Sequence, residues 1–177
     1  MREERFIKQD RELAEEWCNT LNISDIDGVM DVYREAIQSG ILRGRTVPAV
    51  LTTSIYVWVR RNNKPITMRE VADCCGTPKT VVEKIMNKLG PHPKQDPHVF
   101  VQRGFKRLNL PDNTTYQLSK RYTDLGPAMQ AAIAVLLSAR RANHQVNIPS
   151  VSGAVGVQPD AMRRYVTSTG GLKERKI

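Results

Sequence analysis

The sequence predicts an all-α fold made of two tandem repeats of five helices, each repeat ending in a helix-turn-helix. Apolar residues recur at the three- and four-residue spacing of helices through most of the 177 residues. Aromatic residues make up only 6% of the chain, so the core must rest on aliphatic side chains, a bias that fits helices better than strands. A series of short matches also recurs in the same order in both halves, which indicates an internal repeat.

The first half opens with two expected helices. Residues 9–21 predict the first, because apolar side chains four apart share one face. Ser24 is expected to cap the second, since a serine hydroxyl accepts a hydrogen bond from the backbone amides of a first helical turn. Gly40 ends this second helix.

A third helix, residues 47–61, is apolar on most sides, which is typical of the central helix of a bundle. Thr67, followed three residues later by Glu70, predicts a capping box at the start of a short helix. Gly76 ends that helix, and residues 78–89 form a further one that is rich in lysine. A short helix, a tight turn and a second helix predict a helix-turn-helix.

A proline-rich linker is expected between the halves, so the predicted domains are residues 1–90 and 97–177, with the linker at 91–96. The series then begins again. The expected helices are, in order, residues 99–108, residues 113–122 behind a cap at Asp112, an apolar helix opening at Gly126-Pro127, residues 149–155, and, after a turn at Gly156, residues 159–168.

The internal repeat is the most specific feature of the sequence. The tetrapeptide RRNN at 60–63 recurs as RRAN at 140–143, and from there the halves align without a gap at an offset of 80 residues, which pairs Gly76 with Gly156. A duplicated scaffold with no nucleic-acid role would show the same pattern. The repeated arginines close the two central helices, where complementing the helix dipole and contacting phosphate are equally good interpretations.

The charge of the chain favours polyanionic partners. The net charge is +9 and the isoelectric point about 9.7, and a basic excess of this size attracts nucleic acid through counterion release. No apolar run is long enough to span a membrane and the N-terminus has no apolar signal region. We therefore expect no membrane partner and an intracellular protein, cytoplasmic and nucleoid-associated in a prokaryote or archaeon, nuclear in a eukaryote.

Enzymatic and metal chemistry is not expected. The three cysteines include no C-x-x-C pair, so no zinc ribbon can form in this sequence. His92, His98 and His144 lie in expected loops without ligand partners at metal spacing, and surface histidines are the better interpretation. Neither a nucleophile motif nor a glycine-rich phosphate loop is present. We therefore expect no enzyme, no cofactor and no small-molecule substrate.

The ordered motifs of the first half resemble the cyclin-like repeats of transcription factor IIB and of its archaeal counterpart, transcription factor B. Gly44-Arg45 matches a glycine-arginine loop of that family, Ile55-Tyr56 matches a tyrosine-containing central helix, and Thr67–Ala72 matches its T-x-x-E-(I/V)-A helix. In the second half, Arg164-Tyr165 matches an Arg-Tyr pair common in archaeal members. The resemblance covers about residues 3–168 and implies the cyclin-like fold.

The resemblance implies three partners: double-stranded promoter DNA, the TATA-binding protein and RNA polymerase. It implies that the second helix-turn-helix reads upstream DNA in the major groove and that the Gly44-Arg45 loop reaches the downstream minor groove. The expected DNA-binding residues of the first repeat are Arg43, Gly44 and Arg45 in the loop and Lys79, Lys84 and Lys88 on the last helix. Those of the second repeat are Gln158, just before the last helix, and Arg163, Arg164 and Tyr165 on that helix.

Two departures from the family pattern keep an alternative open. The family's zinc ribbon and polymerase-entering segment have no counterpart, which leaves open a minimal initiation factor or a regulator that does not recruit polymerase. Met162 stands where the family has a base-reading arginine, and methionine cannot make a bidentate contact to guanine. The alternative is a cyclin-like interaction module that binds a kinase or other protein and leaves DNA alone.

Overall fold

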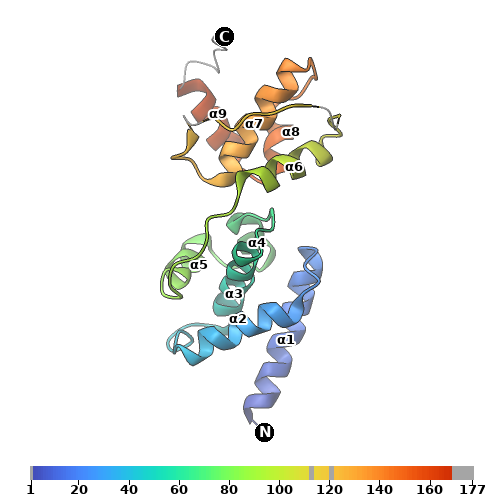
Figure 1. The fold of residues 1–177 in the computed structure, drawn as a ribbon. Helices are drawn as coiled ribbons and strands as arrows, with labels where there is room; N and C mark the ends of the chain where they lie inside the picture. Colours follow the sequence, from blue (N-terminus) through green and yellow to red (C-terminus); the bar gives the residue numbers. More distant parts are fainter. Residues whose placement is uncertain (1, 112–113, 120–121, 169–177) are drawn as a thin grey trace. The chain divides into compact units, whose positions relative to one another are not determined.

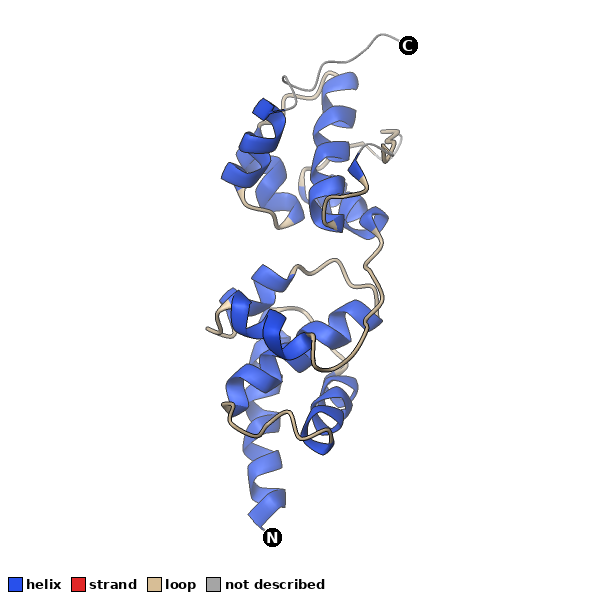
Figure 2. Cartoon of the chain, turned by 90° about the vertical axis from the view of Figure 1, so that its left-hand side faces the viewer, coloured by secondary structure: helices blue, strands red, loops and turns tan. Residues whose placement is uncertain are grey.

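The computed structural model describes residues 2–111, 114–119 and 122–168, and side chains from residue 8 onward within these ranges. The regular secondary structure of these residues is entirely helical (Figure 2), as predicted for an all-α chain. The nine helices found there are α1 (Arg2–Thr20), α2 (Ile26–Gln38), α3 (Val47–Arg61), α4 (Met68–Cys74), α5 (Lys79–Met86), α6 (Pro97–Arg107), α7 (Pro127–Arg141), α8 (Ile148–Val155) and α9 (Pro159–Ser168) (Figure 1).

The chain divides into two compact units, Met1–Lys94 and Gln95–Ile177. The first contains α1 to α5, and the second contains α6 to α9 in the residues described. The boundary falls within the segment Gly90–Asp96, which has no regular structure. Proline cannot donate a backbone hydrogen bond, so the prolines of this segment account for the interruption of the helices.

Helix α3 is the central helix of the first unit. Every residue from Ala49 to Val59 is buried, and α1, α2, α4 and α5 all pack against it. Two polar side chains in this stretch are satisfied locally: the hydroxyls of Thr53 and Ser54 donate to the carbonyls of Ala49 and Val50, one turn earlier, over 2.8 and 3.0 Å. The predicted central helix is therefore confirmed, with the bounds that the apolar pattern indicated.

The first helix-turn-helix begins with the capping box that the sequence predicted at the start of α4. The Thr67 amide donates to Glu70 Oε2 over 2.8 Å, and the Glu70 amide donates to Thr67 Oγ1 over 3.2 Å. Gly76 then takes φ +62° between α4 and α5, a left-handed conformation that glycine adopts without steric cost.

The bounds of the first two helices differ from expectation. Helix α1 begins at Arg2, earlier than predicted, because its first turns are charged and carry no apolar stripe for a sequence pattern to detect. Helix α2 is capped by Asp25 and not by Ser24: Asp25 Oδ1 accepts from the Gly28 amide over 2.9 Å. A carboxylate at this position also suits the positive end of the helix dipole.

The second unit is organised around α7, against which α6, α8 and α9 all pack. Gly104 lets α6 pack closely against both α7 and α8. A methyl group in its place would lie 3.0 Å from both Val135 on α7 and Val155 on α8, tighter than ordinary van der Waals contact. The three helices therefore meet where one of them has no side chain.

The helix predicted over residues 113–122 is wrong. Asp112 and Asn113 lie outside the described residues, and residues 114–119 form no regular secondary structure. Their apolar side chains, Tyr116 and Leu118, are two positions apart and both pack against the core of the second unit. That spacing puts them on one side of an extended chain, whereas on a helix they would point in directions about 200° apart.

The aligned turns of the two units have similar backbones. Asn63 and Asn143, which follow the central helices, have φ of +46° and +56°. Asn22 and Asn109, in the LNI and LNL tripeptides, have φ of +56° and +49°. Asparagine tolerates this left-handed region better than most residues. The shared turns are consistent with a duplicated unit, although residues 114–119 form no helix where the first unit has α2.

Candidate nucleic-acid interface

The loop between α2 and α3 holds the first group of expected DNA contacts. Gly44 takes φ +72° with open space around its α-carbon, so the chain turns sharply there. Arg45 is half-buried and its Nη1 donates to the Ile41 carbonyl over 2.6 Å, which closes the loop on itself. Arg43, by contrast, is exposed. The loop therefore presents one outward arginine beside a left-handed glycine, with the second arginine holding its shape.

The lysines of the first helix-turn-helix are all exposed. Lys79 Nζ lies 3.2 Å from Glu83 Oε1, one turn further along α5, so part of its charge is balanced within the helix. Lys84 lies on α5, while Lys88 lies in the turn that follows the end of the helix at Met86.

The second helix-turn-helix consists of α8, a turn at Gly156 and α9. Helix α8 starts with a capping box in which the Ser150 amide donates to Asn147 Oδ1 over 2.8 Å. It ends at Gly156, which takes φ +88° and whose amide donates to the Ser152 carbonyl. Gln158 is exposed just before α9 begins at Pro159.

Helix α9 is anchored by Met162, which is fully buried. The Ser152 hydroxyl donates to the Met162 sulfur over 3.3 Å, which ties α9 to α8. Met162 therefore faces the core. The side chain at this position lies away from the open face of α9, so the identity of residue 162 does not decide whether the helix contacts bases.

The outward face of α9 carries the charges. Arg163 and Arg164 are both exposed. Arg163 Nη1 lies 2.8 Å from Asp160 Oδ1, and Arg164 Nε donates to the Asp160 carbonyl over 3.4 Å. These residues and Thr167 share a face at helical spacing. Two arginines are thus presented together beside one carboxylate.

Tyr165 lies on the flank of this face. It is half-buried, and its ring meets that of Tyr122 edge to face with centroids 5.9 Å apart. Partial burial raises the pKa of the Tyr165 hydroxyl, which keeps it protonated and able to donate at neutral pH. The ring contact with Tyr122 therefore helps to hold the end of α9 in place.

The arginine pair of the first unit serves an intramolecular purpose. Arg60 Nε donates to the Pro93 carbonyl over 2.9 Å and its Nη2 to the His92 carbonyl over 3.2 Å. Arg61 binds both carboxylate oxygens of Glu35 over 2.8 and 3.0 Å. The sequence left open whether these arginines complement the helix dipole or contact phosphate. In the first unit they do something else: Arg60 binds the linker and Arg61 binds α2.

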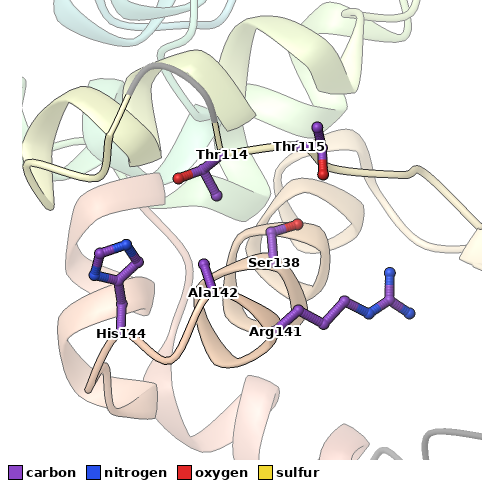
Figure 3. Close-up of a pocket in the computed structure, with 6 residues that line it drawn as sticks. All are labelled: Thr114, Thr115, Ser138, Arg141, Ala142 and His144. Atoms are coloured by element: carbon purple, nitrogen blue, oxygen red, sulfur yellow. The ribbon is translucent and has the colours of Figure 1, made fainter.

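A pocket in the second unit was not foreseen. It has a volume of about 390 Å³ and is lined by Thr114, Thr115, Ser138, Arg141, Ala142 and His144 (Figure 3). His144 therefore borders a polar pocket, where the sequence indicated an ordinary surface histidine. The available signal was the alignment of the halves, which pairs Ser138 with the bulky Trp58.

The structure offers little support for other chemistry in the residues it describes. Within these residues, no three His, Cys, Asp or Glu side chains are grouped so that they could hold a metal ion. Burial raises the pKa of the Cys18 and Cys75 thiols to about 12, so both are protonated at neutral pH. A bilayer-spanning segment is not found among the described helices, since none combines sufficient length with a sufficiently apolar composition.

Comparison with known proteins identifies similar sequences. No family model matches the chain. It is 26% identical to transcription initiation factor IIB 6 of Halobacterium salinarum, over 92% of this chain and 56% of that protein. It is 26% identical to transcription initiation factor IIB of Sulfurisphaera tokodaii, over 96% of this chain and 61% of that protein. It is 27% identical to transcription initiation factor IIB 2 of Halobacterium salinarum, over 76% of this chain and 46% of that protein.

The resemblance inferred from the motifs is therefore confirmed: the chain is similar to transcription initiation factors IIB over most of its length. It spans about half to three fifths of the length of these relatives.

Proposed function

We propose that this chain acts in transcription initiation by binding promoter DNA together with a TATA-binding protein. A role of the transcription initiation factor kind rests on the similar proteins. The observation that carries DNA binding is the construction of α9: Met162 is buried against α8, while Arg163 and Arg164 are presented outward. A helix held at its core face and basic on its open face is suited to lie in a major groove.

The α2–α3 loop supplies a second contact in this proposal. An exposed Arg43 beside Gly44 combines a cation with close backbone approach, which suits the negative potential of a minor groove. Arg45 holds the loop through its bond to Ile41, so its role is to shape the loop more than to touch DNA. The lysines of α5 and its following turn, Lys79, Lys84 and Lys88, add non-specific attraction to phosphate.

Contact with RNA polymerase is a further part of the proposal. The two forms that the sequence leaves open are a minimal initiation factor and a regulator that occupies promoter DNA without recruiting polymerase. The archaeal relatives support action in the cytoplasm, at the nucleoid. A role without catalysis is proposed on the same ground, because the relatives are named as initiation factors.

The alternative, a cyclin-like module that binds a kinase or another protein and not DNA, is less well supported. It was based on the missing counterpart of the zinc ribbon and on Met162, which was interpreted as a lost base contact. Because Met162 is buried, its identity says nothing about contact with bases. The similar proteins also carry the name of an initiation factor and not of a kinase partner.

The proposal is tested by a gel-shift titration on TATA-containing duplex with the TATA-binding protein present. Arg163→Gln and Arg164→Gln each remove one outward cation from α9. The matched control is Arg34→Gln, because Arg34 is also exposed and pairs with an aspartate three residues earlier, Asp31, on α2.

Each α9 variant is expected to weaken the ternary complex about three- to tenfold and to reduce the salt dependence of binding by roughly one phosphate contact. Arg34→Gln is expected to change neither. Equal, small effects of all three variants would contradict DNA contact through α9.

A further inference from the structure

The pocket of the second unit lies where the first unit places a tryptophan. Helices α3 and α7 both have 15 residues and both end in two arginines. Their ends close in the same way, because the Lys64 amide donates to the Val59 carbonyl and the His144 amide to the Ala139 carbonyl, five residues earlier in each case. At the offset of 80 residues, Trp58 corresponds to Ser138.

This exchange of side chains explains the pocket. In the first unit Trp58 is 5% exposed, its indole N–H donates to Asp25, and Lys64 lies over its ring. In the second unit Ser138 is almost as well buried, at 3% exposed, but has a far smaller side chain. Residues 114–119, which lie in the sequence where the first unit has α2, form no regular secondary structure. The volume taken by an indole in one unit is therefore open in the other.

The lining of the pocket is polar and basic. Figure 3 shows Ser138 on α7 and Ala142 just after the end of that helix, with His144 to one side and the Arg141 side chain to the other, below the segment that carries Thr114 and Thr115. Three hydroxyls, a guanidinium and an imidazole can all donate hydrogen bonds. Ala142 is the single apolar side chain among the lining residues, so an aromatic ring would find little to pack against.

The first unit shows what an arginine at this helix position binds. Arg61, which corresponds to Arg141, holds the two oxygens of the Glu35 carboxylate in a bidentate pair. Two oxygens of a phosphate group have a similar geometry. Helix α7 points its negative end toward this region, but Arg140 and Arg141 in its last turn offset that charge.

We infer that this pocket binds a sugar phosphate, with the phosphate at Arg141 and the sugar hydroxyls at Thr114, Thr115 and Ser138. A volume of about 390 Å³ exceeds the needs of a lone phosphate and lies within the range of small-ligand sites. The same chemistry occurs in a free sugar phosphate and in the backbone of a nucleic acid. The inference does not depend on DNA recognition by α9 or on the TATA-binding protein.

The test is a titration of the full chain with ribose 5-phosphate, followed by backbone amide resonances, with ribose as the uncharged control. Three variants accompany it. Arg141→Gln removes the proposed phosphate contact, Arg140→Gln removes an equal charge next to the pocket, and Ser138→Trp places in the pocket the residue of the first unit without altering charge. A second titration uses duplex DNA with the same variants.

If the pocket binds a free sugar phosphate, ribose 5-phosphate is expected to shift the amide resonances of residues 138–144 and ribose is not. Arg141→Gln is then expected to weaken binding about tenfold more than Arg140→Gln. Ser138→Trp abolishes these shifts.

If the pocket binds the sugar-phosphate backbone of a nucleic acid, ribose 5-phosphate has no effect. Arg141→Gln and Ser138→Trp then weaken duplex binding more than Arg140→Gln does. The inference is overturned if ribose 5-phosphate causes no shift and the three variants bind duplex equally. Because Arg141→Gln and Ser138→Trp alter the site in different ways, failure of one to fold still leaves the other as a readout.

Discussion

The indole nitrogen of Trp58 on α3 donates a hydrogen bond to Asp25 Oδ2 over 3.0 Å. The other carboxylate oxygen of Asp25 accepts from the Gly28 amide and caps α2. One aspartate thus starts a helix and binds the central helix at the same time. The arrangement leaves no room at Gly28, where an added methyl group would lie 2.3 Å from Asp25 Oδ2 and 2.6 Å from Trp58 Nε1.

Gly28→Ala is therefore expected to destabilise the first unit by about 1–3 kcal/mol, because the added carbon must displace the carboxylate or the indole. Chemical denaturation measures the change. Gly153→Ala is the matched control: Gly153 is also helical, with nothing within 4 Å of the added carbon, so this variant is expected to gain up to about 1 kcal/mol. Equal effects of the two would contradict the crowding at Gly28.

Thr67→Ala removes one half of the capping box of α4. The Glu70 amide then loses its acceptor at Thr67 Oγ1, and the expected cost is about 1 kcal/mol of unfolding free energy. Thr67→Ser keeps the hydroxyl and is expected to stay close to the parent. If both variants unfold at the same denaturant concentration as the parent, the capping box makes no contribution.

Glu35 makes stability depend on pH at the acid end. Its hydrogen bonds from Arg61 lower the pKa of the carboxyl below the usual value of 4.5. A carboxyl whose pKa is lower in the folded state adds stability above its unfolded pKa and loses that contribution as the pH falls through the folded value. Glu35→Gln is expected to flatten the decline of the melting temperature below pH 4.5. An unchanged acid limb would show that the pair is screened by solvent.

Asp160 opposes DNA binding in this account. Its carboxylate lies 2.8 Å from Arg163, where it balances positive charge and repels phosphate. Asp160→Asn is expected to tighten duplex binding about two- to fivefold at low salt, the worth of one exposed ion pair, and less at high salt. Fluorescence anisotropy with a labelled duplex gives both values. Weaker binding would mean that Asp160 orients Arg163 for contact.

Met162→Arg tests whether residue 162 lies in the core of the second unit, as its burial indicates, or on the face of α9 that would contact bases. An arginine placed there for base contact would enter the core, and the expected loss is more than about 3 kcal/mol. Met162→Leu keeps the apolar volume and is expected to cost less than about 1.5 kcal/mol. Thermal denaturation distinguishes the two. A stable Met162→Arg protein with tighter DNA binding would place residue 162 on the open face of α9.

Local signals in the sequence account for much of the fold. The apolar pattern of α3 and the Thr67–Glu70 capping box both depend on neighbouring residues, and the structure has them as predicted. The helix predicted over residues 114–119 was wrong because the structure of this segment depends on the contacts of Tyr116 and Leu118 with the core. These are tertiary contacts, which helical periodicity in the sequence does not reveal. Helix propensity is a weak guide where tertiary packing opposes it.

The candidate site was harder to predict than the fold. The sequence indicated basic residues on α9, but only the packing of Met162 against Ser152 shows which way the helix faces. Arg45 was expected to reach DNA, and we propose from its hydrogen bond to the Ile41 carbonyl that it supports the loop instead. The pocket at Ser138 arises from the absence of a large side chain, which no motif records.

The central claim is tested most directly by a gel shift of the unmodified chain on a TATA-containing duplex and on the same duplex with a scrambled TATA element, each with and without a TATA-binding protein. The account predicts a slower band that requires both the TATA element and the TATA-binding protein and that weakens as salt rises. Equal binding to both duplexes without the TATA-binding protein, or no binding at low salt in any lane, would contradict it.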